Sequence, residues 1–382
     1  MNLKKKIITF VNVIKLNIII FKFKVFNPKN KVIFFYHPKK LLTFIHLNYI
    51  KDLFNSFNED YLTLYGHEVD KFYEKNHYFI SHSFLLKWIF NVDIFISVNV
   101  SDVFTKNSTA IYMHHDIYDT PLVDAKNEKK LFQRLIKYDY LFLSNRKNIA
   151  MFQNFFNKHN SDFSNKIPKL METGYLKLDY LRKKIKLDRK IDNSIVIAPT
   201  DYRHVEKLSI YDDLENLIKN ILSNTKFEIF FRPHPSNRNT LKILNIVNSF
   251  KNNGNFKLDK NEEYFEVYSK SVCLITDISG TAYTYAFLTN KPVIFFSKNE
   301  KLINELGHGK LSYFEDRNKI GAIIKNSNEI LEIINNINSL EKKIKISNNS
   351  LLKEINYLGN SKNRIKEIIN EILIKKNNRE KI

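Results

Sequence analysis

Two polar motifs, Arg-Pro-His-Pro and Thr-Asp-Ile-Ser-Gly-Thr, each follow an apolar run in the second half of the chain. In the first motif, the Arg232 guanidinium offers paired N–H donors to phosphate oxygens, and the His234 imidazole can donate a hydrogen bond or a proton near neutral pH. In the second motif, a helix that begins at Ser279 leaves the N–H groups of Gly280 and Thr281 without intrahelical partners, which favours an anion. Together the two motifs predict a diphosphate site.

These residues also have structural interpretations. Pro233 and Pro235 would end a strand whatever the function of the motif, and Ser279 is a good helix cap in any context. Asp277, just before that cap, could hold a ribose, orient a histidine or simply form a turn. The phosphate-binding and structural interpretations are compatible, because one strand end and one helix start would serve both.

Short apolar runs that alternate with helical patterns are the elements that would position these motifs. This rhythm predicts parallel sheets whose strands are covered by helices on both faces. The expected strands of a first series are 32–36, 61–65, 93–98, 110–113 and 140–143, and those of a second series are 194–197, 227–231, 272–275 and 292–296. The expected fold class is α/β, with two doubly wound, Rossmann-like domains that face each other across a cleft.

Polar residues follow further expected strands, and ligands of doubly wound sheets bind at the carboxyl ends of strands. His114 and His115 follow the fourth strand of the first series, and Thr200 and Arg203 follow the first strand of the second series. A histidine pair alone is more often a loop cap or a core pair, but a strand-end position favours a functional role. Neither metal-ligand spacing nor a glycine-rich nucleotide loop is present in the sequence, so no metal is expected.

The chain length of 382 residues suits two domains. A polar, charged stretch at 183–193 separates the two strand series, as a linker would. We expect a basic amphipathic segment at 1–26, a first Rossmann-like domain at 27–187, a second at 188–345 and C-terminal helices at 346–382.

The composition limits the partners and the compartment. The net charge is +21, but no nucleic-acid-binding signature accompanies the lysines, so an anionic membrane surface or a phosphate-bearing polymer is the expected partner rather than nucleic acid. Cys273 is the only cysteine. It cannot form an internal disulfide, which fits a reducing, cytoplasmic location.

The first 26 residues are apolar and rich in lysine, and the first acidic residue is Asp52. Lys15, Lys22 and Lys24 interrupt the apolar stretches, so none reaches the about 20 residues of a membrane span. A signal-peptide cleavage site is also missing. The segment is therefore either a basic amphipathic element on an anionic leaflet or an ordinary first helix or strand with a solvated lysine face.

The motifs, taken in order, resemble those of the CDP-glycerol glycerophosphotransferases of teichoic-acid and capsule assembly, which have the GT-B architecture of two Rossmann-like domains. The resemblance covers roughly residues 100–300 and rests on the segments Met113–Leu122, Gly174–Asp179, Ala198–Arg203, Arg232–Pro235 and Thr276–Ala286. Arg-Pro-His-Pro matches the family pattern without change. Near the donor site, Gly280 replaces a serine of that pattern and Thr284 replaces an aspartate.

The resemblance implies a transferase that moves an alditol phosphate from a CDP-alditol, such as CDP-glycerol, to a hydroxyl of a teichoic-acid-like or capsule polymer. His115 is the implied base, His114 is the second candidate, and Asp119 or Asp116 would orient the base. The implied donor-binding residues are Arg232, His234, Ser279, Gly280, Thr281, Asp277, Thr200 and Arg203, with Gly174 in support.

The implied partners are the nucleotide-activated donor, a polymer or lipid-linked acceptor and an anionic membrane surface at the inner face of the cell membrane, and no cofactor is required. Two other functions remain open. One is a GT-B glycosyltransferase that uses a CMP- or UDP-activated sugar in capsule or lipooligosaccharide synthesis. The other is a non-catalytic GT-B-like protein that binds nucleotide or polymer.

Overall fold

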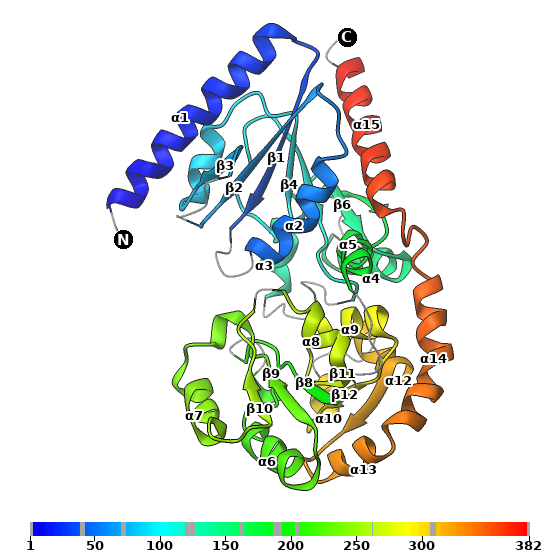
Figure 1. The fold of residues 1–382 in the computed structure, drawn as a ribbon. Helices are drawn as coiled ribbons and strands as arrows, with labels where there is room; N and C mark the ends of the chain where they lie inside the picture. The colour runs from blue at the N-terminus through cyan, green and yellow to red at the C-terminus, as the bar shows by residue number, and fades with distance from the viewer. Residues whose placement is uncertain are drawn as a thin grey trace. The chain divides into compact units, whose positions relative to one another are not determined.

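The computed structural model describes residues 3–38, 43–69, 74–118, 122, 127–160, 164, 166–185, 193–202, 206–261, 263–305 and 311–379. The chain forms two compact units (Figure 1). The first unit contains residues 1–115, 125–177 and 356–382, and the second contains residues 116–124 and 178–355. The chain therefore enters the second unit twice, at residues 116–124 and 178–355, and returns to the first unit for the last time at residue 356.

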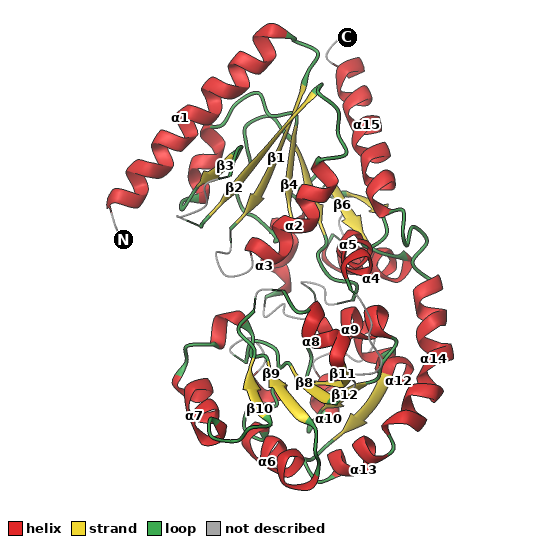
Figure 2. Ribbon diagram, viewed as in Figure 1, coloured by secondary structure: helices red, strands yellow, loops and turns green. Residues whose placement is uncertain are grey.

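The first unit is built on a seven-stranded sheet of order β3-β2-β1-β4-β5-β6-β7 (Figure 2). Its strands are β1 (Lys31–His37), β2 (Tyr61–His67), β3 (His77–Phe79), β4 (Ile94–Ser97), β5 (Thr109–Met113), β6 (Tyr140–Leu143) and β7 (Lys169–Glu172). Its helices are α1 (Leu3–Phe26), α2 (Thr43–Phe54), the 3-10 helix η2 (Ser83–Trp88), α3 (Glu128–Leu135), α4 (Arg146–His159), the start of α5 (Leu176–Lys184) and α15 (Ser361–Arg379).

The second unit is built on a six-stranded sheet of order β10-β9-β8-β11-β12-β13. Its strands are β8 (Ser194–Ile197), β9 (Glu228–Phe231), β10 (Phe256–Leu258), β11 (Ser271–Thr276), β12 (Val293–Phe296) and β13 (Gly321–Ile324). Its helices include α6 (Leu214–Asn224), α7 (Leu241–Phe250), α8 (Phe265–Lys270), α9 (Thr281–Thr289) and α10 (Glu300–Glu305). They continue with α11 (Ser312–Glu315), α12 (Arg317–Ile320), α13 (Glu329–Asn335) and α14 (Ile337–Lys353), and the 3-10 turns are η4 (Glu206–Leu208) and η5 (Pro235–Asn237).

Every strand pair in both sheets is parallel. In each sheet the chain first winds from the centre to one edge and then from the centre to the other edge. The central strands β4, β8 and β12 are buried along their whole length, because helices cover both faces of a doubly wound sheet. These features confirm the predicted α/β fold class.

Helix α1 packs one face against the first unit. Leu16 and Ile20 are fully buried in the core beneath the sheet. Near the end of the helix, Lys24 Nζ lies 2.7 Å from Asp93 Oδ2, and that carboxylate also accepts the Val32 N–H at 2.8 Å. Within the described residues, no helix has the length and apolar character needed to cross a membrane.

Helix α15 returns the chain to the first unit, alongside residues far away in sequence. The Tyr61 hydroxyl donates to Asn370 Oδ1 at 2.6 Å, and Lys362 Nζ lies 2.9 Å from the Asp52 carboxylate. The segment before α15 packs on Gly174. A Cβ at this glycine would lie 2.8 Å from Tyr357 Cβ and 3.0 Å from the Tyr357 carbonyl oxygen.

Gly174 also has a φ of +75°, a conformation that costs other residues about 1–2 kcal/mol. Two constraints therefore require glycine here: the backbone conformation and the close approach of the returning chain. Gly174, which the family resemblance implies as a support for donor binding, has a packing role in the first unit.

Three glycine-to-alanine substitutions separate these two constraints. Gly174→Ala should lower the free energy of unfolding by about 2–4 kcal/mol, because strain and overpacking add. Gly359→Ala should cost about 1 kcal/mol, since Gly359 has a φ of +83° but open space around an added Cβ. Gly254→Ala, where an added Cβ also meets nothing within 4 Å, should cost nothing. Urea denaturation measures all three, and equal losses at 174 and 359 would show that the packing is unimportant.

Candidate functional site

Each sheet reverses its winding direction between two neighbouring strands, β1 and β4 in the first unit and β8 and β11 in the second. Ligands of doubly wound folds bind beyond the carboxyl ends of strands at such a point. In the first unit, His37 ends β1 and Asn99 follows β4. In the second, Thr200 follows β8 and Asp277 follows β11. The structure therefore puts polar side chains at both switch points.

His115, which follows β5, is held by contacts to its ring and to its backbone. Its Nδ1 lies 2.7 Å from the Val98 carbonyl oxygen. A carbonyl can only accept, so Nδ1 carries the proton and Nε2 has the lone pair in the neutral ring. The Tyr175 hydroxyl donates to the His115 carbonyl oxygen at 3.1 Å. The ring is thus held as an acceptor of protons at Nε2.

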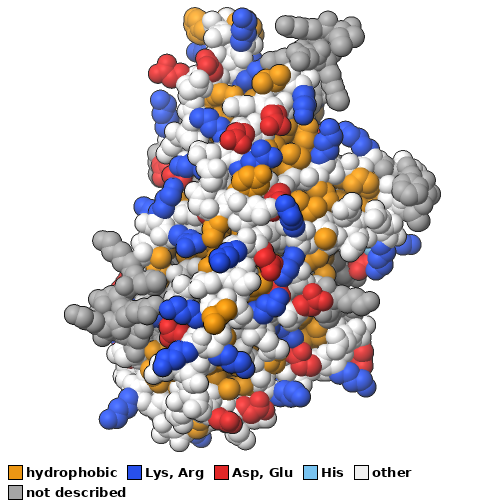
Figure 3. Space-filling model, turned by 90° about the vertical axis from the view of Figure 1, so that its right-hand side faces the viewer, with side chains coloured by type: hydrophobic (Ala, Val, Ile, Leu, Met, Phe, Trp, Pro, Cys, Tyr) orange, Lys and Arg blue, Asp and Glu red, His pale blue; other side chains and the backbone are white. Residues whose placement is uncertain are grey.

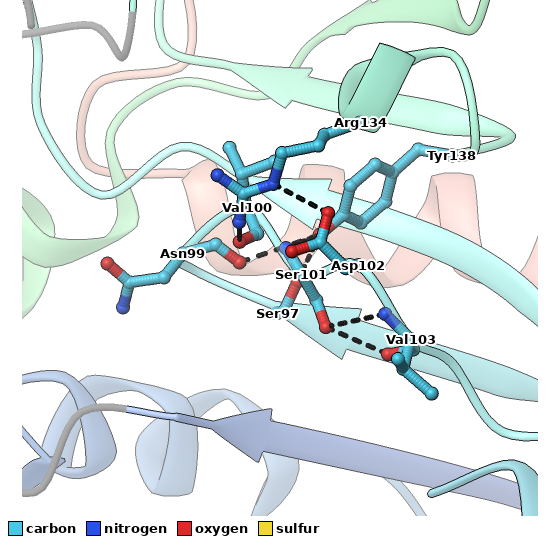
Figure 4. Close-up of polar contacts among 8 residues, drawn as sticks. All are labelled: Ser97, Asn99, Val100, Ser101, Asp102, Val103, Arg134 and Tyr138. Atoms are coloured by element: carbon cyan, nitrogen blue, oxygen red, sulfur yellow. Dashed lines mark hydrogen bonds and ion pairs between the residues drawn. The ribbon is translucent and has the colours of Figure 1, made fainter. Parts of the chain in front are cut away.

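The loop after β4, which presents the Val98 carbonyl, is fixed by a polar network (Figure 4). Its members are Ser97, Asn99, Val100, Ser101, Asp102, Val103, Arg134 and Tyr138. The Tyr138 hydroxyl lies 2.8 Å from Ser97 Oγ and accepts the Ser101 N–H at 2.7 Å. Burial raises the pKa of Tyr138 to about 12, so its phenol stays neutral and keeps its proton. Arg134 binds the same loop through the Asp102 carboxylate and the Val100 carbonyl.

His114 has a different environment from its neighbour. Its side chain is buried, and its Nδ1 accepts a hydrogen bond from Asn148 Nδ2 at 3.2 Å. Its ring packs edge-to-face on Phe152. His115 is half-buried, so it is the more accessible residue of the pair.

Two histidines that the sequence did not single out form a row with His115, in which His46 is the middle member. The ring centroid of His46 is 4.9 Å from that of His115, and His46 Nδ1 is 2.8 Å from His37 Nε2. No spacing links these residues in the sequence, because they come from β1, α2 and the loop after β5. The only available cue was that His37 directly follows an apolar run.

Asp277 in the second unit is almost fully buried, and its oxygens bind backbone N–H groups. Oδ1 accepts from Thr200 at 2.9 Å and from Ile278 at 2.8 Å, and Oδ2 accepts from Ile210 at 3.2 Å. Burial raises the pKa of Asp277, and the hydrogen bonds from these N–H groups oppose that rise. Asp277 therefore ties the loop after β8 to the turn after β11, which is the turn-forming role that the sequence also allowed; the ribose and histidine contacts stay predictions.

Arg232 follows β9 and forms a buried ion pair. Its Nη1 lies 2.5 Å from Asp259 Oδ2, and its guanidinium carbon lies 5.4 Å from the Tyr264 ring centroid. Both charged side chains are less than 10% exposed. Removing one partner of such a pair typically costs about 3–5 kcal/mol. Arg232 thus stabilises the second unit, whatever it contributes to phosphate binding.

His234 has the opposite tautomer to His115. Its Nδ1 accepts the Ser236 N–H at 3.3 Å, so the proton of the neutral ring is on Nε2. Asp201 Oδ2 lies 3.8 Å from the same Nδ1 and would stabilise a protonated ring. His234 is therefore a hydrogen-bond donor through Nε2, and its side chain is 28% exposed.

Helix α9 begins later than the sequence predicted. Its first residue is Thr281 and its N-cap is Gly280, which has no side chain to cap with. Ser279 instead lies in the turn, where its carbonyl accepts the Ala282 N–H at 3.0 Å and the Tyr313 hydroxyl at 3.1 Å. The prediction that Ser279 caps the helix is wrong, because the turn fixed by Asp277 takes up two more residues. The Thr281 hydroxyl pairs with the Tyr268 hydroxyl.

Some predicted site residues lie outside the described part of the chain. They are Arg203 and Asp119. Asp116, the alternative to Asp119, is buried. Among the described residues, no group of three or more His, Cys, Asp and Glu side chains is placed to hold a metal ion.

Comparison with known proteins adds a family. The family described as CDP-Glycerol:Poly(glycerophosphate) glycerophosphotransferase matches residues 60–371. No curated protein sequence gives a significant match.

Several solved structures share the fold. The wall teichoic acid polymerase TagF is 18% identical with a TM-score of 0.61, over 96% of this chain and 98% of that one. A TagF variant soaked with CDPG is 16% identical with a TM-score of 0.61, over 98% of each chain. UDP-GlcNAc 2-epimerase from Neisseria meningitidis, bound to UDP-GlcNAc, is 13% identical with a TM-score of 0.55, over 90% of this chain and 100% of that one. At such identities the likeness concerns the fold.

The loop network makes a prediction about stability. Tyr138→Phe removes a hydroxyl that binds Ser97 and Ser101, and the buried Ser101 N–H loses its acceptor. The free energy of unfolding should fall by about 1–3 kcal/mol. Tyr78→Phe, at a half-buried tyrosine of β3, controls for loss of a phenolic hydroxyl and should change it by less than about 0.5 kcal/mol. Urea denaturation that finds the two variants equally stable would contradict the role given to the network.

Proposed function

The chain belongs to the CDP-glycerol:poly(glycerophosphate) glycerophosphotransferase family and is therefore a transferase, and on this premise we propose the reaction that it catalyses. An alditol phosphate, glycerol phosphate or a close relative, passes from a CDP-alditol to a hydroxyl of a growing cell-surface polymer. One observation carries this proposal. The neutral His115 ring has its proton on Nδ1, whereas the neutral His234 ring has its proton on Nε2.

His115 is the general base in this proposal. Its Nε2 takes the proton of the acceptor hydroxyl while the hydroxyl oxygen forms a bond to the β-phosphorus of the donor. The bond between that phosphorus and the bridging oxygen breaks, and CMP leaves with the electron pair. The Val98 carbonyl at Nδ1 keeps the lone pair on the opposite side of the ring and stabilises the imidazolium that forms.

The second unit binds the donor in this proposal. The His234 Nε2–H donates to the diphosphate, and the Arg232 guanidinium offsets its charge. The N–H groups at the start of α9 donate to the same diphosphate, because a helix N-terminus favours an anion. We propose that no cofactor is needed, because these groups together meet the negative charge that develops on CMP.

A glycosyltransferase is the alternative, and Gly280 and Thr284 are the reason to test it. At these two positions the chain departs from the family pattern near the donor. Released nucleotide decides between the functions when the protein is supplied with a membrane acceptor and CDP-glycerol, CDP-ribitol, CMP-sugars or UDP-sugars in turn. CMP from a CDP-alditol supports phosphotransfer. Turnover only with a nucleotide sugar supports the glycosyltransferase, and no turnover with any of these donors contradicts both.

Loss of the base should reduce turnover strongly. His115→Asn is expected to lower kcat for CMP release from CDP-glycerol by about 10²–10⁴-fold, with little change in the KM for the donor. His159→Asn is the control, because His159 pairs with Glu128 at the end of α4 and takes no part in the mechanism. A His115→Asn protein with the kcat of the His159→Asn protein would remove His115 from the mechanism.

We also propose that the protein binds the cytoplasmic face of the membrane, where a lipid-linked acceptor would be presented. The outer face of α1 exposes large apolar side chains at helical spacing: Ile7, Phe10, Val11, Ile14, Ile18, Phe21 and Val25. Lys4, Lys15 and Lys22 follow one edge of this stripe, 11 and 7 residues apart, and Lys6 and Lys24 follow the other. A helix that is apolar on both faces needs a cover for its outer one.

The fold extends this stripe with a second element. Phe84, Trp88 and Phe90 of the η2 region are also exposed. Asn17 fixes them beside α1, since its side chain donates to the Trp88 carbonyl at 2.8 Å and accepts the Phe90 N–H at 2.9 Å. By contrast, the face seen in Figure 3, on the side of α15, carries acidic and basic side chains with scattered apolar ones. An anionic bilayer fits apolar side chains edged by lysines, whereas a second copy would bring like charges together.

The triple variant Ile14→Ser, Ile18→Ser and Phe21→Ser should weaken sedimentation with phosphatidylglycerol-containing vesicles by at least about 10-fold, through lost apolar burial. The control replaces Leu241, Ile346 and Ile374 by serine, which are exposed elsewhere, and should sediment like the unaltered protein. Trp88 is the only tryptophan, so its emission should shift to the blue on binding. Equal sedimentation of both variants, or a dimer that buries the stripe, would contradict membrane binding.

A further inference from the structure

A row of three histidines crosses the switch point of the first sheet, and the proposed reaction uses only its outer member. His37 at the end of β1 is fully buried, and His46 of α2 is 3% exposed. Their rings are 5.0 Å apart between centroids, and the ring of His46 is 4.9 Å from that of His115. Each distance lies in the range of favourable ring contacts.

The hydrogen bonds along this histidine row define which nitrogen donates. Asn99 Nδ2 is 3.2 Å from His37 Nε2 and can only donate, so His37 Nε2 is an acceptor. His46 Nδ1, 2.8 Å from the same Nε2, therefore carries a proton and donates a hydrogen bond to His37. The His46 ring is thus held at its Nδ1 edge by His37, the last residue of β1.

Burial distinguishes the two inner histidines from His115. A charged imidazole loses its hydration in a buried site, which disfavours the protonated form. His37 and His46 are nearly inaccessible to solvent, whereas His115 is half-buried. A neutral His46 can therefore lie against His115 without repelling the positive charge that His115 gains in the reaction.

We infer that His46 is a positioning residue, which holds the His115 ring in the plane that aims Nε2 at the acceptor hydroxyl, and that His37 acts through it. This inference rests on the proposed role of His115 as base. Val98 fixes one edge of the His115 ring, and a hydrogen bond at one edge restrains the tilt of a ring less than a contact with its face does. Contact with the His46 ring restricts that tilt.

The kinetic test is a double-mutant cycle on the full-length protein with CDP-glycerol and a membrane acceptor. His46→Ala and His37→Ala should each lower kcat by about 10- to 100-fold, with the KM for CDP-glycerol unchanged. The double variant should lose no more than His46→Ala alone, because both residues act through one ring. Losses that multiply, or a kcat that does not change, would overturn the inference.

Two conservative variants separate the ring from its hydrogen bond. His46→Phe keeps a ring against His115, and His46→Asn keeps an N–H donor for His37. His46→Phe should retain more activity than His46→Asn, and the reverse order would contradict a role for ring contact. His77→Ala is the control for removal of a buried histidine, since His77 stacks on Tyr65 at 4.4 Å between centroids; it should leave kcat unchanged.

A measurement without substrate distinguishes failure of this inference from failure of the proposed reaction. In protein labelled with ¹⁵N-histidine, the His115 signals, assigned with His115→Asn, should report the Nδ1–H tautomer. In His46→Ala the signals should keep this tautomer but shift and broaden, because the ring can tilt about its hydrogen bond to Val98. An unchanged His115 spectrum in that variant overturns the inference, even if no donor gives turnover. A changed His115 spectrum supports the positioning role of His46 even if the unaltered protein releases no CMP. In that case only the proposed reaction is wrong.

Discussion

The hydrogen bond between the His115 ring and the Val98 carbonyl is the constraint on which the proposed chemistry of the first unit depends. A backbone carbonyl does not titrate, so the ring keeps its Nδ1–H tautomer at every pH at which it is neutral. In the relays of serine hydrolases a carboxylate occupies that place. Here the position of the carbonyl depends on the loop after β4, and that loop depends on contacts to Tyr138 and Arg134.

The second unit uses its polar residues to order the backbone around its switch point. Asp277 binds N–H groups from two loops, and Arg232 pairs with a buried aspartate. These side chains are charged, yet their nearest partners are groups of the protein itself. The His234 ring is more exposed than either. A site of this kind has a rigid frame of buried charges and a small number of accessible donors.

The sequence predicted the central strands and the two histidine motifs, because long apolar runs and strand-end residues are local signals. It missed the short edge strands β3, β7, β10 and β13, whose three or four residues are only partly buried and form no long apolar run. It also missed His37 and His46, since residues of β1, α2 and the β5 loop meet only in three dimensions. The structure shows that Asp277 accepts hydrogen bonds from main-chain N–H groups, and the order of side chains in a sequence does not indicate such contacts.

The return of α15 to the first unit has a consequence for biosynthesis. The ribosome delivers the whole of residues 178–355 before the helix that contacts Tyr61 and Gly174 is available. The second unit can therefore fold on the nascent chain while the first, although begun earlier, still lacks part of its surface. Until that helix has been synthesised, the strands that carry the histidines belong to a unit that still lacks part of its surface.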